Sequence, residues 1–143
     1  MPARPVVPAG AGTAALGRAG EDAAAEHLRR AGLKILARNW RHGRLELDLV
    51  CRRGRMLVFV EVKTRGPGSR GAPAEALGRA QAARLARAAA AWLSEHDAWD
   101  TPCRFDLVTA TPGPDGAGFT IDHRPGAFTL DELPDAADLW QPF

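Results

Sequence analysis

The segment that most constrains the fold of this 143-residue chain is residues 56–63, MLVFVEVK. Its β-branched and aromatic residues favour a β-strand. Because side chains alternate along a strand, one face would carry Met56, Val58, Val60 and Val62, and the other Leu57, Phe59, Glu61 and Lys63. Both faces are apolar at first. The pattern predicts a central strand that is covered on both sides and becomes charged only at its end.

A second strand is predicted directly upstream, at residues 45–50, where Leu alternates with Glu and Asp. An Arg-Arg-Gly turn at residues 52–54 would join the two strands into a hairpin. The register of this hairpin decides whether Asp48 and Glu61 meet. If the numbers of paired residues sum to 107 or 109, Asp48 lies diagonal to Glu61 or directly opposite it, respectively, on the same face of the sheet. If the sum is even, the two side chains are separated. The sequence leaves the register open.

The other elements complete an α/β pattern. We expect a helix from Thr13 to Gly32 and a second from Pro73 to about His96, because Thr is a good N-cap, Gly a helix stop and Pro a first-turn residue. Strands are expected at residues 104–111 and 119–123. The predicted fold is a mixed β-sheet flanked by helices. Its domain would span residues 13–128, between a flexible leader (1–12) and an acidic tail (129–143) with weak amphipathic helix character.

Composition excludes several classes of protein. No run of 18 apolar residues suggests a membrane span, and the first 20 residues lack a secretory h-region, so we expect a cytoplasmic protein with no membrane partner. The two cysteines form no C-x-x-C pair and the four histidines are scattered, which gives no support for a disulfide framework or a zinc motif. P-loop and serine-hydrolase motifs are absent.

The net charge of +2 conceals two unlike parts. Residues 1–90 hold 17 Lys and Arg against 7 Asp and Glu, and residues 91–143 hold 2 against 10. Only Lys34 and Lys63 are lysines among the 19 basic residues. Lysine differs from arginine in being a compact charge whose pKa can fall on burial, so Lys63 beside Glu61 suggests a chemical role.

The acidic residues of the hairpin point to metal chemistry. Two carboxylates as close as Asp48 and Glu61 repel unless a cation or a proton lies between them, and hard oxygen ligands suit Mg²⁺ or Mn²⁺. Lys63 could then position a water molecule and stabilise charge on a phosphate. Glu21 lies on the apolar stripe of the first predicted helix, where a carboxylate is out of place.

Each of these residues also has a purely structural interpretation. Glu61 and Lys63 could mark a solvated strand end, and Glu21 could be exposed or paired with an arginine at the edge of the core. Gln81, on the stripe of the second helix, could be a satisfied buried amide. The arginines could be ordinary surface charge, although their excess near the carboxylates matches a polyanion-binding face.

Five stretches of this chain resemble the YraN-like family of predicted endonucleases, which is related to Holliday-junction resolvases in the restriction-endonuclease-like, PD-(D/E)xK superfamily. They are Gly20-Glu21, residues 33–40 (LKILARNW), 46–50 (ELDLV), 58–65 (VFVEVKTR) and 104–108 (RFDLV). The resemblance covers about residues 13–128. It departs from the family pattern at Leu45, where a glycine is usual, and at Gln81, where a lysine is common.

The resemblance implies a role for each site residue. Asp48 and Glu61 would be metal ligands, with the carbonyl of Val62 as a further ligand, Lys63 would be the catalytic lysine, and Glu21 would be the helix carboxylate of resolvase-like members. The implied fold is restriction-endonuclease-like.

We therefore expect a Mg²⁺- or Mn²⁺-dependent endonuclease that hydrolyses phosphodiester bonds in DNA, with branched or structured DNA among the candidate substrates. The candidates for contacts with the DNA backbone are Arg52, Arg53, Arg55, Arg65 and Arg70. The alternative is a nucleic-acid-binding module that keeps the nuclease fold without turnover. A third interpretation makes the acidic tail a docking surface or a strip that covers the basic face. A homodimer is compatible with resolvase-like chemistry, but no sequence feature fixes its surface.

Overall fold

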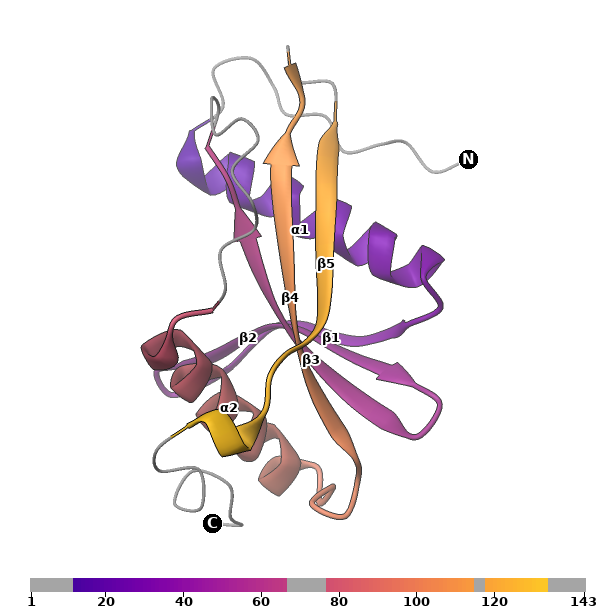
Figure 1. The fold of residues 1–143 in the computed structure, drawn as a ribbon, viewed down its shortest axis with the longest axis vertical. Helices are drawn as coiled ribbons and strands as arrows, with labels where there is room; N and C mark the ends of the chain where they lie inside the picture. The colour runs from indigo at the N-terminus through magenta and orange to yellow at the C-terminus, as the bar shows by residue number, and fades with distance from the viewer. Residues whose placement is uncertain (1–11, 67–76, 115–117, 134–143) are drawn as a thin grey trace.

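The computed structural model describes residues 12–66, 77–114 and 118–133, which form a five-stranded sheet and two α-helices (Figure 1). In chain order the elements are α1 (Thr13–Arg30), β1 (Lys34–His42), β2 (Leu45–Arg53), β3 (Met56–Thr64), α2 (Arg79–Glu95), β4 (Cys103–Pro112), β5 (Phe119–Phe128) and the 3-10 helix η2 (Leu130–Glu132). The strand order is β1-β2-β3-β4-β5. Only β3 and β4 are parallel, and α2 lies in the crossover that connects them. This mixed sheet flanked by helices confirms the predicted α/β fold and is consistent with a restriction-endonuclease-like architecture.

The central strand is β3, as predicted. Val58 and Val60 pack with Leu28 of α1 in one buried cluster. Leu57 and Phe59 pack with Trp92 of α2 in a second cluster on the opposite face. The two helices therefore cover the two faces of the sheet, and in Figure 1 α1 lies behind β4 and β5 while α2 lies at the lower left.

The ends of the helices depend on glycines. At the end of α1, Gly32 has a φ of 94°, and the amide of Leu33 donates to the carbonyl of Leu28 at 3.0 Å. The predicted stop is thus confirmed within two residues. The second helix begins later than predicted, at Arg79, because Gly78 is extended with a ψ of 158°. Pro73, the predicted start, lies outside the described residues.

The strand β1 was not predicted from periodicity. Its burial does not alternate, and Asn39 in its middle has a φ of 51°, which interrupts the pleat. Arg38 and Asn39 are exposed, so the segment lacks the regular pattern of a half-buried strand. It nevertheless pairs along β2, from Lys34 opposite Arg52 to His42 opposite Leu45.

The C-terminal part of the domain extends further than predicted. β5 continues past His123 to Phe128, and its register with β4 shifts between Phe105 and Leu107. Leu133 is only 6% exposed and packs in the cluster under α2. Leu133 therefore packs in the core beyond residue 128, and the exact end of the domain stays a prediction. Residues 134–143 of the predicted tail lie outside the described part of the chain.

Neither α1 nor α2 is long and apolar enough to cross a membrane, and no other helix in residues 12–66, 77–114 and 118–133 is.

A close approach of α1 to β3 makes Gly20 sensitive to substitution. A Cβ atom at Gly20 would meet Oγ1 of Thr64 and lie 2.8 Å from its Cγ2. Gly20→Ala is therefore expected to lower the free energy of unfolding by about 1–3 kcal/mol, because the helix or the threonine must move. Gly17→Ala, where nothing lies within 4 Å, is the matched control and should raise stability by up to about 1 kcal/mol. Urea unfolding of both variants measures the difference, and equal effects would contradict this account.

Candidate active site

The hairpin register brings the two predicted carboxylates together. Leu49 pairs with Val60, so paired residue numbers sum to 109 and Asp48 comes opposite Glu61. The main-chain pairing of β2 with β3 ends at Leu49, and beyond it the amide N–H of Val62 donates to Oδ2 of Asp48 at 2.8 Å. The Asp48 carboxylate thus accepts from the Val62 amide the hydrogen bond that a main-chain carbonyl would accept if the pairing continued.

The strand β2 changes direction at this point. Leu47 packs in the cluster under α2, whereas Leu49 packs in the cluster under α1. Strict alternation would put both leucines on one face, so β2 bends at Asp48. The bend separates the ends of β2 and β3 and leaves space between them for a site.

Burial and mutual repulsion define the electrostatics of the pair. Burial, followed by the charge of Glu61, raises the pKa of Asp48 to about 7. Burial also raises the pKa of Glu61, although a hydrogen bond with Asp48 and the positive charges of Lys63 and Arg84 oppose this rise. Two half-buried carboxyl groups in this state hold a shared proton or require a cation between them.

The pair opens into a cavity of about 240 Å³ between the hairpin and α2. Its walls are Arg44, Leu45, Glu46, Asp48, Glu61, Gln81, Arg84 and Leu85. Gln81, noted in the sequence as an amide on an apolar stripe and as a departure from the family pattern, lines this cavity. Arg44, Glu46 and Arg84 were not predicted. The helical spacing of Arg84 from Gln81, three residues along α2, was the signal that could have found it.

Lys63 lies on the same face of β3 as Glu61, two residues further on, and is half-buried. Its charge lowers the pKa of Glu61, which places the ammonium group in electrostatic reach of the carboxylate pair. The backbone of Val62 lies at the pair through its hydrogen bond to Asp48. The use of its carbonyl as a metal ligand stays a prediction.

Glu21 approaches the pair from α1. Burial and then the charge of Asp48 raise its pKa, and a hydrogen bond with Asn39 lowers it. The neighbouring Asp22 forms a 2.6 Å ion pair with Arg38 of β1, which fixes this turn of the helix against the sheet. Glu21 is thus coupled to Asp48 but does not line the cavity.

The predicted DNA-contact arginines are not all near the carboxylates. Arg65 directly follows the end of β3, two residues after Lys63, and its amide donates to the carbonyl of Ala110 at 2.8 Å. Arg52, Arg53 and Arg55 lie at the opposite end of the hairpin, because Asp48 and Arg52 are four residues apart on one strand, or about 14 Å. These three arginines therefore lie apart from the carboxylates along the hairpin, and their contact with the DNA backbone stays a prediction. Arg70 lies outside the described residues.

The donor set fits a hard divalent cation. In the described residues, no group of three or more His, Cys, Asp or Glu side chains is arranged to hold a metal ion. Mg²⁺ does not require such a cage, because it keeps several waters and binds through one or two carboxylates together with substrate phosphates. The repelling pair of Asp48 and Glu61, opening into a cavity with Arg84, meets this requirement.

The raised pKa of Asp48 gives a prediction for stability. Between about pH 4 and pH 7 the folded protein holds a proton that the unfolded chain releases, so the contribution of this group to stability falls as pH rises. Asp48→Asn keeps an acceptor for the Val62 amide but cannot ionise. We expect it to be more stable than wild type at pH 8 by about 1–2 kcal/mol, after allowance for solvent screening, and to lose this advantage below about pH 4.

Denaturant unfolding at several pH values checks this, with Asp122→Asn, an exposed carboxyl on β5 that does not line the cavity, as the control. Mn²⁺ should stabilise wild type at pH 8 and leave Asp48→Asn unchanged. A variant that is less stable than wild type at pH 8 would contradict the assigned repulsion.

Comparison with known proteins identifies the family. The model of "Uncharacterised protein family UPF0102" matches residues 20–110. A UPF0102 protein of Nitratidesulfovibrio vulgaris (strain DP4) is 51% identical over 130 residues, which cover 90% of this chain and 96% of the relative. UPF0102 proteins of Symbiobacterium thermophilum and Frankia casuarinae are 50% and 47% identical, over 71% and 80% of this chain and 86% and 96% of their own lengths. The chain therefore belongs to the UPF0102 family, the YraN-like family that its motifs resemble.

Proposed function

We propose that this protein is a metal-dependent endonuclease that hydrolyses phosphodiester bonds in DNA. The observation that carries the proposal is the position of Asp48 and Glu61, which face each other at the split between β2 and β3, with Lys63 on the same face. Structural ion pairs rarely need two adjacent half-buried carboxylates whose pKa values are both raised, whereas a cation site does.

The chain offers a role for each group. Asp48 and Glu61 would hold Mg²⁺ or Mn²⁺, and the bound ion would polarise the phosphate and lower the pKa of an attacking water. Lys63 would orient that water and stabilise the negative charge that develops on the phosphate. Glu21, through its coupling to Asp48, would support this ion or hold a second one.

Arg84 extends this assignment to the substrate. Its guanidinium lines the same cavity from α2, and a planar guanidinium can donate two hydrogen bonds to one phosphate. A phosphate at the mouth of the cavity could then contact Arg84, while Lys63 acts on the same carboxylate pair through its charge. Such positioning contributes to phosphoryl-transfer catalysis without covalent chemistry by the protein.

The test is cleavage by the full chain of supercoiled, linear and four-way-junction DNA with Mg²⁺, with Mn²⁺ and with EDTA. Cleavage that requires a divalent cation and is lost in Glu61→Gln supports the nuclease. Salt-sensitive binding without cleavage, unchanged by EDTA, would instead favour a binding module. Preference for the junction over linear DNA would identify branched DNA as the substrate.

The remaining expectations follow from this proposal. Action on DNA would put the protein in the cytoplasm, and a homodimer would present two such sites to two strands. Sedimentation velocity distinguishes dimer from monomer.

A deletion that tests the acidic tail should begin at residue 134, because removal of Leu133 would open the core. Tighter DNA binding after that deletion supports a tail that covers the basic face.

A further inference from the structure

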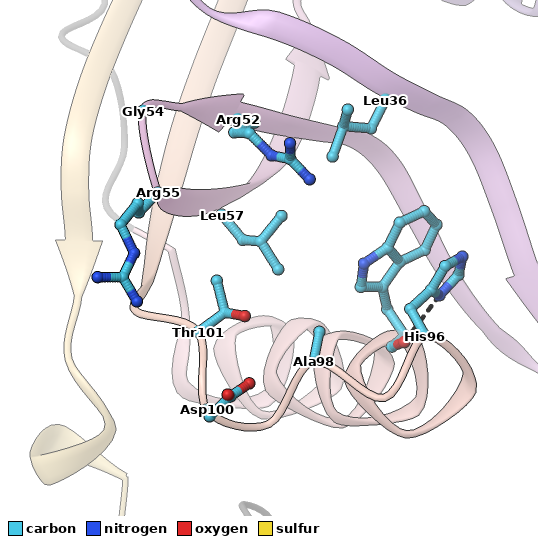
Figure 2. A pocket seen from close by; sticks show the side chains of 10 residues that line it. Leu36, Arg52, Gly54, Arg55, Leu57, His96, Ala98, Asp100 and Thr101 are labelled. Atoms are coloured by element: carbon cyan, nitrogen blue, oxygen red, sulfur yellow. Dashed lines mark hydrogen bonds between the residues drawn. The ribbon is translucent and has the colours of Figure 1, made fainter.

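A second and larger cavity, of about 620 Å³, lies at the other end of the hairpin (Figure 2). Four parts of the chain line it: β1 through Leu36, the β2–β3 hairpin end, the end of α2 and the loop from α2 to β4. In Figure 2 the side chain of Leu57 lies at the centre, with Arg52 and Arg55 on the hairpin side and Asp100 and Thr101 on the opposite side. An apolar floor with a few polar groups around it is typical of a ligand site.

The hairpin side of the cavity is cationic. Arg52 and Arg55 both line it, and neither forms an ion pair with any carboxylate of the described residues. Arg53, between them in sequence, does not line the cavity, because it points to the other face of β2. Two unpaired guanidinium groups beside a cavity fit an anion, and their forked donors match a phosphate.

The end of α2 adds an aromatic wall. The rings of Trp92 and His96 stack at 3.6 Å between centroids and 19° between planes, and Nδ1 of His96 lies 2.9 Å from the carbonyl oxygen of Trp92. Because a carbonyl only accepts, His96 donates through Nδ1, which fixes the ring against the helix. Both residues line the cavity. A rigid aromatic pair beside guanidinium groups suits a planar base that carries a phosphate.

The opposite wall can recognise the edge of a base. The carboxylate of Asp100 accepts hydrogen bonds, and the hydroxyl of Thr101 donates or accepts them. These are the groups that pair with the amino and carbonyl groups of a nucleobase. In the nuclease proposed above, this cavity and the carboxylate pair lie on the same α2 face of the hairpin, about 14 Å apart along β2.

We propose that this cavity binds an unpaired nucleotide of the nucleic-acid substrate. Arg52 and Arg55 bind its phosphate, the Trp92–His96 pair and Leu57 contact its base, and the carboxylate site cleaves the strand about four base-pair steps away. The role in cleavage rests on the proposed function, whereas the binding of a nucleotide does not. The protein would thus recognise the unpaired end or branch of a DNA beside the bond that it cuts.

The experiment is a titration of the full chain with deoxyadenosine 5′-monophosphate in EDTA, followed by tryptophan fluorescence and calorimetry. Arg52→Ala and Arg55→Ala should each weaken binding about tenfold, the loss expected for one charged hydrogen-bonding partner. Arg53→Ala, in the same turn but outside the cavity, is the matched control and should change binding less than about twofold. Inorganic phosphate should compete with the nucleotide.

Two further sets of measurements distinguish the contacts to the base from the contacts to the phosphate, and this cavity from the nuclease site. His96→Ala, which removes a surface ring, should weaken both the nucleotide and deoxyadenosine, whereas the arginine variants should leave deoxyadenosine binding unchanged. Lys63→Ala should bind the nucleotide like wild type, so a failure of nuclease activity is distinguishable from a failure of this site. Absence of nucleotide binding, or equal losses in Arg52→Ala and Arg53→Ala, would overturn the proposal.

Discussion

Lys63→Ala is expected to lower the rate of metal-dependent DNA cleavage by about 10²–10³-fold, the usual cost of removing one group that stabilises developing charge. The ammonium of Lys63 lies on the face of β3 that carries Glu61, and its charge already acts on that carboxyl group. Arg84 also acts on Glu61 with a positive charge, but it does so from α2, so it does not replace the lysine on β3.

The chain offers a matched control for this substitution. Lys34 is the other lysine of the sequence and is exposed at the start of β1, so Lys34→Ala should cleave DNA like wild type. Binding of Mn²⁺ by Lys63→Ala should persist, because Asp48 and Glu61 are intact. Single-turnover cleavage with excess protein measures the chemical step. Equal rates for Lys63→Ala and wild type would remove Lys63 from the mechanism.

Asp106→Ala is expected to cost about 3–5 kcal/mol of folding free energy, the largest effect on stability that the structure predicts. The Asp106 carboxylate is fully buried. It accepts two hydrogen bonds from Arg104 at 2.8 and 2.9 Å and one from the Gly126 amide at 3.0 Å, and Nε2 of His123 lies 2.7 Å from Oδ2. Its removal would leave an arginine, a histidine and a main-chain amide of β5 without their partner.

The stability that Asp106 contributes should depend on pH, in the direction that its shifted pKa sets. Burial alone would raise the pKa of Asp106, but the hydrogen bonds with His123, Arg104 and Gly126 outweigh it and hold the pKa below its usual range. A lowered pKa contributes stability above about pH 4 that is lost as the pH falls further. The difference in the free energy of unfolding between wild type and Asp106→Ala should therefore become smaller in strong acid.

Guanidinium unfolding of Asp106→Ala and Asp122→Ala checks this prediction. Asp122 lies on the neighbouring strand, is exposed and pairs with Arg124 only at 3.6 Å, so its loss should cost less than about 1 kcal/mol. Comparable losses in the two variants would contradict the assigned network.

The part of the fold that could be predicted is the part whose residues carry a regular pattern. β3 was predictable because both of its faces are apolar, and the hairpin followed from its turn residues. β1 was missed because Asn39 interrupts its pleat and its burial does not alternate. The late start of α2 was missed because Gly78, rather than Pro73, precedes its first turn.

The same distinction holds for the candidate site. The pair of Asp48 and Glu61 was predictable up to the choice of register, which the sequence could not make because it depends on the turn geometry. Arg84 reaches the pair only through the packing of α2 on the sheet, which no local pattern encodes. Asp106 belongs to no local pattern beyond the motif at residues 104–108, and its partners come from three separate positions on β4 and β5.

The central claim is that Asp48 and Glu61 hold a divalent cation beside Lys63. Crystals of the full chain soaked in Mn²⁺ at pH 8, where the pair can ionise, test it through the anomalous difference map. We predict one strong peak at about 2.0–2.2 Å from carboxylate oxygens of both residues, which is absent in Asp48→Asn crystals. A map with no peak between them, or a peak that persists in Asp48→Asn, would contradict the account.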